Sequence, residues 1–69
     1  MKWTDSENIG IALDGKFPGE DPLAIRFADL RQRVLDLDGF DDDPMASNEP
    51  KLEAIQMAWL EERNLRLRE

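Results

Sequence analysis

Hydrophobic side chains recur every three or four positions in three parts of this 69-residue chain. That spacing places them on one side of an α-helix, where they are buried together. The clearest run lies between positions 27 and 37 and consists of Phe27, Leu30, Val34 and Leu37. If this helix continued, Asp38 would turn toward the buried side. We therefore predict that the helix ends near Leu37, with Gly39 as its C-terminal cap.

A first helix is predicted from about Asp5 to Lys16. Residues 4–7, with the sequence TDSE, match a capping box, in which a Thr hydroxyl and a Glu carboxylate bond free backbone N–H groups. The apolar side of this helix is formed by Ile9, Ala12 and Leu13. Trp3 directly precedes the cap. Packing against the core edge is the expected role of its ring, and contact with a partner protein is the alternative.

Turn-forming residues separate the first helix from the second. Residues 17–20 contain Pro and Gly in succession, which indicates that the first helix ends there. Asp21 followed by Pro22 then predicts a helix N-cap with proline at the first helical position. A second helical segment is expected to start at this point. The sequence leaves open whether it runs unbroken into Phe27 or pauses in a short bend.

A third long helix is predicted after position 47. Ser47 or Asn48 serves as its N-cap, and Pro50 is compatible with the first turn because N–H groups there have no intrahelical partner. Its buried side is formed by Leu52, Ile55 and Trp59. The apolar pattern fails beyond Glu62. We expect residues 63–69 to fray or to extend the helix out of the domain.

Charge narrows the functional classes. The chain carries a formal charge of −7, but its last seven residues carry +2, so residues 1–62 carry −9. Such a body repels DNA, RNA and anionic lipid and is attracted to cations or basic protein surfaces. We therefore expect no nucleic-acid and no membrane partner. The same charge argues for a monomer.

The residue types that are missing also exclude several chemistries. The chain has no Cys and no His, so thiol nucleophiles, zinc clusters and imidazole bases are not possible. It also lacks a Gly-rich phosphate loop and an apolar run of the roughly 20 residues that span a bilayer. We expect a single small cytoplasmic domain that is not an enzyme.

The most negative part of the chain lies between positions 36 and 43. Five aspartates fall within these eight positions: Asp36, Asp38, Asp41, Asp42 and Asp43. The spacing does not fit an EF-hand, because Phe40 occupies a ligand position and Asp43 stands where the loop needs Gly. Three interpretations stay open: a solvated loop, a protein-docking surface, or an open site for a divalent cation. On the preceding helix, Asp29 and Asp36 either extend this acidic surface or form a solvated face with an ion pair to Arg33.

A longer motif that includes the acidic stretch helps to decide among these interpretations. Residues 40–49 read FDDDPMASNE, and residues 52–55 and 59–60 read LEAI and WL. This string resembles the signature of the IscX family, which are small accessory proteins of iron-sulfur cluster assembly. Further matches are Lys2 to Asp5, Ile9-Gly10, Ala12-Leu13, Asp21-Pro22, Arg26-Phe27, Asp29 and Asp36-Leu37. The resemblance covers about residues 2–62. We expect residues 1–62 to form a single domain and residues 63–69 a basic C-terminal extension, frayed or helical.

The resemblance implies an all-α fold, a small orthogonal helical bundle that is winged-helix-like. It implies an accessory protein that binds the cysteine desulfurase IscS through its acidic surface, at a site overlapping that of frataxin. No tightly bound cofactor is expected, but Fe²⁺ is bound weakly by carboxylates. The protein would modulate desulfurase activity or supply iron. A stand-alone acidic divalent-metal-binding protein with no obligate partner is the alternative.

Matching positions supply the expected site residues. The partner-binding set, which includes the aromatic before the first helix and the Arg of the acidic face, is Trp3, Asp29, Arg33, Asp36, Asp41, Asp42 and Asp43. The expected metal ligands are Asp5, Asp29, Asp36, Asp41, Asp42 and Asp43. Asp21 and Glu49 also match, but both have ordinary capping roles. Arg33 departs from the family pattern, and its charge would weaken cation binding or docking on that face.

Overall fold

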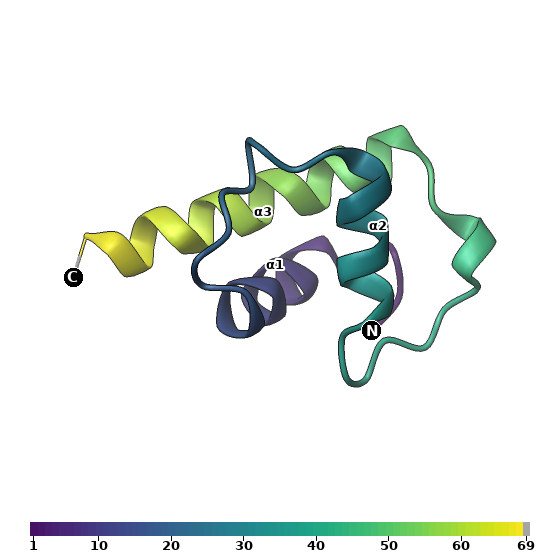
Figure 1. Ribbon diagram of the computed structural model, residues 1–69. Helices are drawn as coiled ribbons and strands as arrows, with labels where there is room; N and C mark the ends of the chain where they lie inside the picture. Colours follow the sequence, from purple (N-terminus) through teal and green to yellow (C-terminus); the bar gives the residue numbers. More distant parts are fainter. Residues whose placement is uncertain (69) are drawn as a thin grey trace.

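The computed structural model describes residues 1–68, and Glu69, the last residue of the expected extension, lies outside the described residues. Its elements are α1 (Ser6–Lys16), α2 (Phe27–Leu35), the single 3-10 turn η1 (Pro44–Ala46) and α3 (Glu49–Leu67). The α3 helix is the longest, and both α1 and α2 pack against it (Figure 1). The predicted small all-α fold is confirmed. Residues 1–68 contain no strand that would form a wing, so the winged-helix-like detail is not confirmed.

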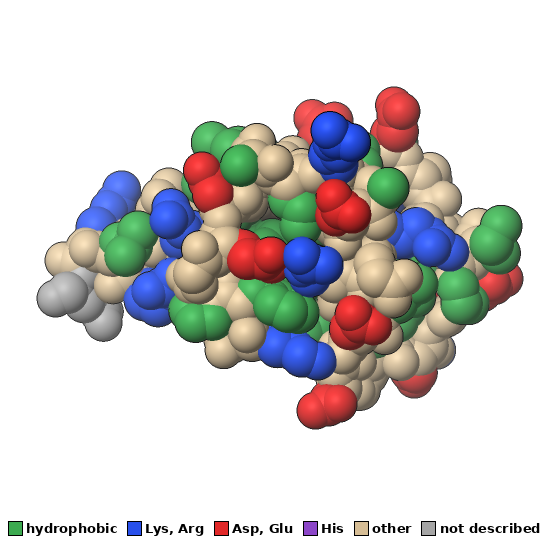
Figure 2. Space-filling model, viewed as in Figure 1, with side chains coloured by type: hydrophobic (Ala, Val, Ile, Leu, Met, Phe, Trp, Pro, Cys, Tyr) green, Lys and Arg blue, Asp and Glu red, His purple; other side chains and the backbone are tan. Residues whose placement is uncertain are grey.

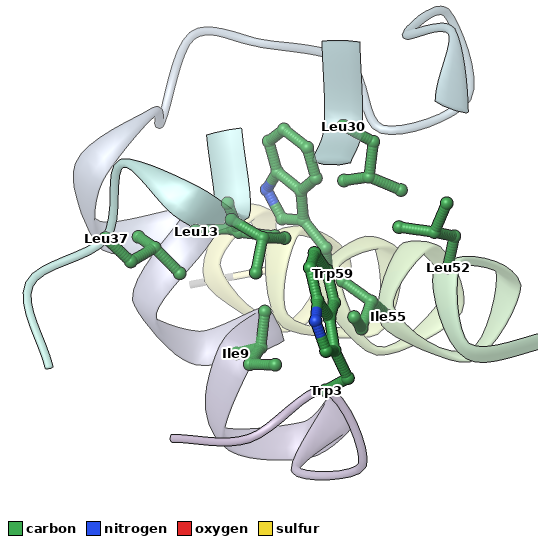
Figure 3. Packing of buried hydrophobic residues seen from close by; sticks show 9 residues of the cluster. Trp3, Ile9, Leu13, Leu30, Leu37, Leu52, Ile55 and Trp59 are labelled. Atoms are coloured by element: carbon green, nitrogen blue, oxygen red, sulfur yellow. The ribbon is translucent and has the colours of Figure 1, made fainter. Parts of the chain in front are cut away.

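The three helices enclose one hydrophobic core. Every helix contributes to it, and so does the segment before α1; the buried residues are Trp3, Ile9, Leu13, Leu30, Val34, Leu37, Leu52, Ile55 and Trp59. Figure 3 shows the two indole rings at the centre of this cluster. The predicted apolar sides of the helices are therefore confirmed, except that Phe27 and Ala12 are only partly buried. Among residues 1–68, no helix is long and apolar enough to cross a membrane.

The start of α1 differs from the prediction. Its N-cap is Asp5, and no side chain of the capping residue bonds a helix N–H group. The Asp5 carboxylate instead accepts a hydrogen bond from the backbone N–H of Lys2, at 2.8 Å. The Asp5 N–H donates to the Lys2 carbonyl at 2.9 Å, which closes a tight turn over residues 2–5. The predicted capping box, with Thr4 as the cap, was therefore wrong. The turn over residues 2–5 places Asp5 at the N-cap position and directs its carboxylate toward Lys2.

The segment before α2 forms a turn and not a helix. The Asp21 carboxylate accepts from the Leu23 N–H at 2.9 Å, as a cap would, and the Asp21 carbonyl accepts from the Ala24 N–H at 3.1 Å. The turn does not propagate, because Arg26 is extended and α2 begins only at Phe27. A second helical segment starting at Asp21 was therefore wrong, and the chain bends before the helix.

The end of α2 also comes earlier than predicted. The helix ends at Leu35 with Asp36 as its C-cap, two residues before the expected end at Leu37. The Leu37 N–H bonds the Val34 carbonyl at 3.1 Å, so the chain tightens into a turn while Leu37 is still buried. Gly39 follows with φ of +82°, a backbone conformation that favours glycine. Gly39 thus shapes the turn after the helix and does not cap it.

The α3 helix begins as predicted. The Asn48 side chain accepts a hydrogen bond from the Lys51 N–H at 2.9 Å, and Pro50 lies in the first turn. The helix continues through Arg63 to Leu67. There Arg66 contacts α1, because its guanidinium donates to both carboxylate oxygens of Asp14 at 2.9 and 3.2 Å. Asp14 is only 8% exposed, so this ion pair joins the end of α3 to the body of the protein.

Helices α1 and α3 approach each other closely at Gly10. A Cβ atom added there would lie 2.7 Å from the backbone carbon of Ala58 and 2.8 Å from the backbone nitrogen of Trp59. Backbone atoms cannot move aside as the end of a flexible side chain can. The absence of a side chain at position 10 therefore sets the distance between the two helices.

We predict that Gly10→Ala lowers the free energy of unfolding by about 1–3 kcal/mol, because the helices must separate to accept the methyl group. The matched control is Gly15→Ala in the same helix, where an added Cβ meets nothing within 4 Å. This control gains helix propensity and is expected to be neutral or up to about 1 kcal/mol more stable. Urea denaturation followed by circular dichroism measures both, and equal effects of the two variants would contradict the close approach.

We also predict that Arg66→Gln destabilises the protein by about 1–2 kcal/mol, a value discounted for the partial exposure of the guanidinium. The cause is the almost buried carboxylate of Asp14, which loses its charged partner. Arg68→Gln, with the same charge change at an exposed position, should stay within about 0.5 kcal/mol of the parent. Amide hydrogen exchange over residues 60–67 should accelerate only in Arg66→Gln, and unchanged exchange there would refute the attachment.

Candidate functional site

The acidic loop, which we define as residues 36–43, lies between α2 and η1, beside the N-terminal segment. Three of its aspartates, Asp41 to Asp43, bond to residues 1–3. The loop is therefore not a loose connection. It is held in a defined shape by a segment almost 40 positions earlier in the chain.

Trp3 makes the central attachment. Its ring is fully buried and packs edge-on against Phe40, with 4.7 Å between ring centroids. Its backbone N–H donates to the Asp42 carboxylate at 3.0 Å, and its indole Nε1–H donates to the Asp43 carbonyl at 2.7 Å. Trp3 therefore joins the loop to the hydrophobic core. Because the ring is fully buried, it does not offer a surface to a partner in this conformation.

Asp42 and Asp43 use their carboxylates to bond backbone N–H groups. Asp42 accepts from Trp3 and also from the N–H of Asp43, at 2.7 Å, and these two bonds, in that order, lower the pKa of Asp42. Asp43 caps η1 by accepting from the Met45 N–H at 2.9 Å. Both residues were expected to bind a partner or a metal. In the structure each one stabilises the loop.

Asp41 is more open, with its side chain 65% exposed. One carboxylate oxygen lies 2.8 Å from the α-amino group of Met1, and the other lies 3.5 Å from Nζ of Lys2. The hydrogen bond from the α-amino group, followed by the charge of Lys2, lowers the pKa of Asp41. Asp41 therefore remains ionised and accessible, but part of its charge is already compensated.

Arg33 does not pair with Asp29, which was the ion pair suggested by their spacing. Its guanidinium donates to both carboxylate oxygens of Glu20, each at 2.9 Å, and lies over the ring of Phe17 at 5.4 Å. The hydrogen bond from Arg33 lowers the pKa of Glu20. Since Glu20 takes up the charge of Arg33, this arginine opposes docking on the α2 face less than the sequence suggested.

In the acidic region formed by α2 and the acidic loop, the carboxylates that remain available to a partner lie on α2 and in the first part of the loop. Asp29 and Asp38 are exposed, and the described residues offer neither of them a hydrogen bond. Asp36 is exposed too. Its carboxylate accepts from the Gln32 amide at 3.1 Å, and its backbone carbonyl accepts from Nζ of Lys16 at 2.6 Å. Asp38 was not among the predicted site residues, although its place in the acidic stretch was a usable signal. These three are the best candidates for contact with a basic surface.

The predicted metal ligands do not converge. Within residues 1–68, no group of three or more carboxylates is placed to hold a metal ion. Acidic side chains are dispersed over the face seen in Figure 2, with Lys and Arg between them. The Asp5 carboxylate is already used to accept the backbone N–H of Lys2. As arranged, these residues do not fit a dedicated iron site, and a cation would be bound by one or two carboxylates with water.

We predict that Asp42→Asn lowers the melting temperature at neutral pH, whereas Asp38→Asn, with the same charge change, leaves it nearly unchanged. The folded-state pKa of Asp42 lies below its ordinary value of 3.8. The stabilisation is therefore complete well above that value and is lost as pH falls through the folded-state pKa. Thermal melts between pH 7 and pH 2 should show the two variants converging at low pH. Equal melting temperatures at pH 7 would contradict the structural role of Asp42.

Two comparisons with known proteins identify the family of this chain. A family model described as iron-sulphur cluster assembly matches residues 1–64. An uncharacterized protein of Pseudomonas aeruginosa is 52% identical over 64 residues, which cover 93% of this chain and 97% of that protein. The match ends two residues before Arg66, so the attachment of α3 to Asp14 lies partly outside the matched region. The chain belongs to the iron-sulphur cluster assembly family, as its resemblance to the IscX family predicted.

Proposed function

We propose that this protein is a non-catalytic accessory factor of iron-sulfur cluster assembly that docks on the cysteine desulfurase IscS. The observation that carries the proposal is the set of exposed carboxylates at the end of α2 and the start of the acidic loop: Asp29, Asp36 and Asp38. They lie on a folded support, and they make at most one side-chain hydrogen bond each within the described residues. A negative surface of this kind accelerates association with a positive one.

The effect on the enzyme follows from the position of docking. In the IscX family, the docking place lies near the desulfurase active site and overlaps that of frataxin. A small rigid protein bound there would alter access to the active site and compete with frataxin. We therefore propose modulation of desulfurase activity as the function. The supply of iron receives less support, because the carboxylates do not converge.

Weak binding of Fe²⁺ stays part of the proposal in a limited form. One or two exposed carboxylates with water ligands provide hard oxygen donors but neither high affinity nor selectivity. A stand-alone metal-binding protein would need a preorganised group of ligands, and residues 1–68 hold none of three or more carboxylates. No observation thus favours that alternative over the docking protein.

The roles of the aspartates determine which variant tests docking. Changing Asp42 and Asp43 would release the loop from the core, so weaker binding would not distinguish a lost contact from a disordered loop. The exposed positions avoid this problem. The suitable variant is Asp29→Asn/Asp36→Asn/Asp38→Asn. Its control, Glu49→Gln/Glu53→Gln/Glu62→Gln, changes the net charge equally at positions on α3, outside the α2 face and the acidic loop.

We predict that the aspartate variant binds the desulfurase of its own organism roughly tenfold more weakly, mainly through slower association, while the control stays within about threefold. Calorimetry gives the affinity and stopped-flow fluorescence the association rate. Rising salt should weaken the parent more than the aspartate variant. Sulfide release from cysteine, with and without frataxin, reports modulation.

Two results would overturn the proposal. Equal weakening by the two variants would show that net charge alone acts and that no docking face lies on α2 and the acidic loop. Absence of saturable binding, with Fe²⁺ or without it under anaerobic conditions, would remove the desulfurase as partner. If Fe²⁺ changes the desulfurase affinity, the desulfurase must change the Fe²⁺ affinity by the same factor.

A further inference from the structure

A second surface of the molecule is open and is not used by the proposed function. It is a groove of about 670 Å³ between the start of α1 and the second half of α3, lined among others by Glu7, Ala54, Met57, Glu61 and Leu65. A smaller hollow of about 250 Å³, lined by Pro50 and Lys51, adjoins it. Ser6 and Ala54 line both hollows.

The dimensions of the groove match a helix. It follows α3 from Ala54 to Arg68, and at 1.5 Å per residue this distance is about 21 Å, the length of roughly 14 helical residues. Its floor holds the small side chains Ser6, Ala54 and Ala58, which permit close approach of another backbone. Of the large hydrophobic side chains that this protein exposes, Met57 and Leu65 border the groove, at 52% and 46% exposure.

The charges along the groove indicate the character of the occupant. Glu7 of α1 and Glu61 of α3 border it from its two sides. Both belong to the exposed residues, and residues 1–68 offer neither carboxylate an ion pair. The groove therefore has a mixed polar and apolar lining with two unpaired acidic side chains. Lys51 borders the smaller hollow, and Arg68 borders the groove near the C-terminal end of α3.

We infer that this groove binds an amphipathic helix of another protein, whose apolar stripe is flanked by Lys or Arg. The apolar stripe packs on Met57 and Leu65, and the basic flanks pair with Glu7 and Glu61. A second copy of this chain fits poorly. A symmetric pairing along the whole groove would bring four carboxylates, from Glu7 and Glu61 of both copies, near the twofold axis between two chains of charge −7.

This inference does not rest on the proposed function, since the groove is built from α1 and α3 and the docking carboxylates lie on α2 and in the acidic loop. It is tested with a 14-residue synthetic helix of Leu and Lys in amphipathic order, and with the same peptide carrying Glu in place of Lys. Each is titrated into the ¹⁵N-labelled protein. Chemical-shift changes of the backbone amides locate the peptide, and the titration gives its Kd.

We expect the Leu/Lys peptide to bind saturably with shifts at the groove residues, and the Leu/Glu peptide to bind at least tenfold more weakly. Met57→Ser/Leu65→Ser should weaken binding roughly tenfold, since two apolar contacts are lost. Leu23→Ser/Met45→Ser is the matched control at exposed positions outside the groove and should leave the Kd within about twofold.

A basic peptide could also bind the acidic loop and not the groove. Two further variants distinguish binding at these two surfaces. Glu7→Gln/Glu61→Gln should weaken binding more than Asp29→Asn/Asp38→Asn, which changes the charge equally on the other surface. Shifts confined to residues 29–43, or equal effects of the groove variants and their controls, would overturn the inference. Thermal melts confirm that each variant is folded, as expected for substitutions at exposed positions.

Discussion

The attachment of Trp3 to the acidic loop is the contact on which the shape of the functional surface depends. Asp41 to Asp43 would repel one another in a free loop, and a free loop would lose conformational entropy on docking. Burial of the indole ring and the two hydrogen bonds that Trp3 donates to the loop, one from its backbone N–H and one from Nε1–H, offset this repulsion. The same contact divides the aspartates into two groups. Asp42 and Asp43 hold the loop, whereas the Asp38 carboxylate forms no hydrogen bond within residues 1–68 and remains available for the proposed docking.

The sequence predicted the helices and the core well, because the apolar spacing of each helix directly reflects the side that is buried. Leu30, Val34, Ile55 and Trp59 are all fully buried, as their spacing indicated. The errors occurred at helix ends. The Asp5 carboxylate bonds backward to Lys2, and the Asp21 carboxylate caps a turn that does not continue into a helix. Which N–H group a carboxylate bonds depends on the backbone conformation of a few neighbouring residues. Residue type alone does not define that conformation.

The site could be located but not resolved from the sequence. The run of aspartates identified the region, yet the role of each carboxylate depends on partners far away in the chain. Arg33 donates to Glu20, which lies 13 positions away in the sequence. Trp3 donates to Asp42, which lies 39 positions away. A helical wheel shows only neighbours three or four positions apart, so it favoured an Asp29–Arg33 pair. For the same reason a helical wheel could not predict the ion pair of Arg66 with Asp14, which are 52 positions apart.

Small size explains why so many charged groups have structural roles here. A chain of 69 residues buries a limited apolar area, and this one has no disulfide to restrict its unfolded state. Ion pairs and backbone-directed hydrogen bonds at Asp14, Asp42 and Asp43 therefore supplement the core. Every carboxylate used in this way becomes less available to a cation or a partner. Dispersed carboxylates on a firm support favour docking to an extended basic surface, because such a surface meets each one separately, whereas a metal ion requires several at one point.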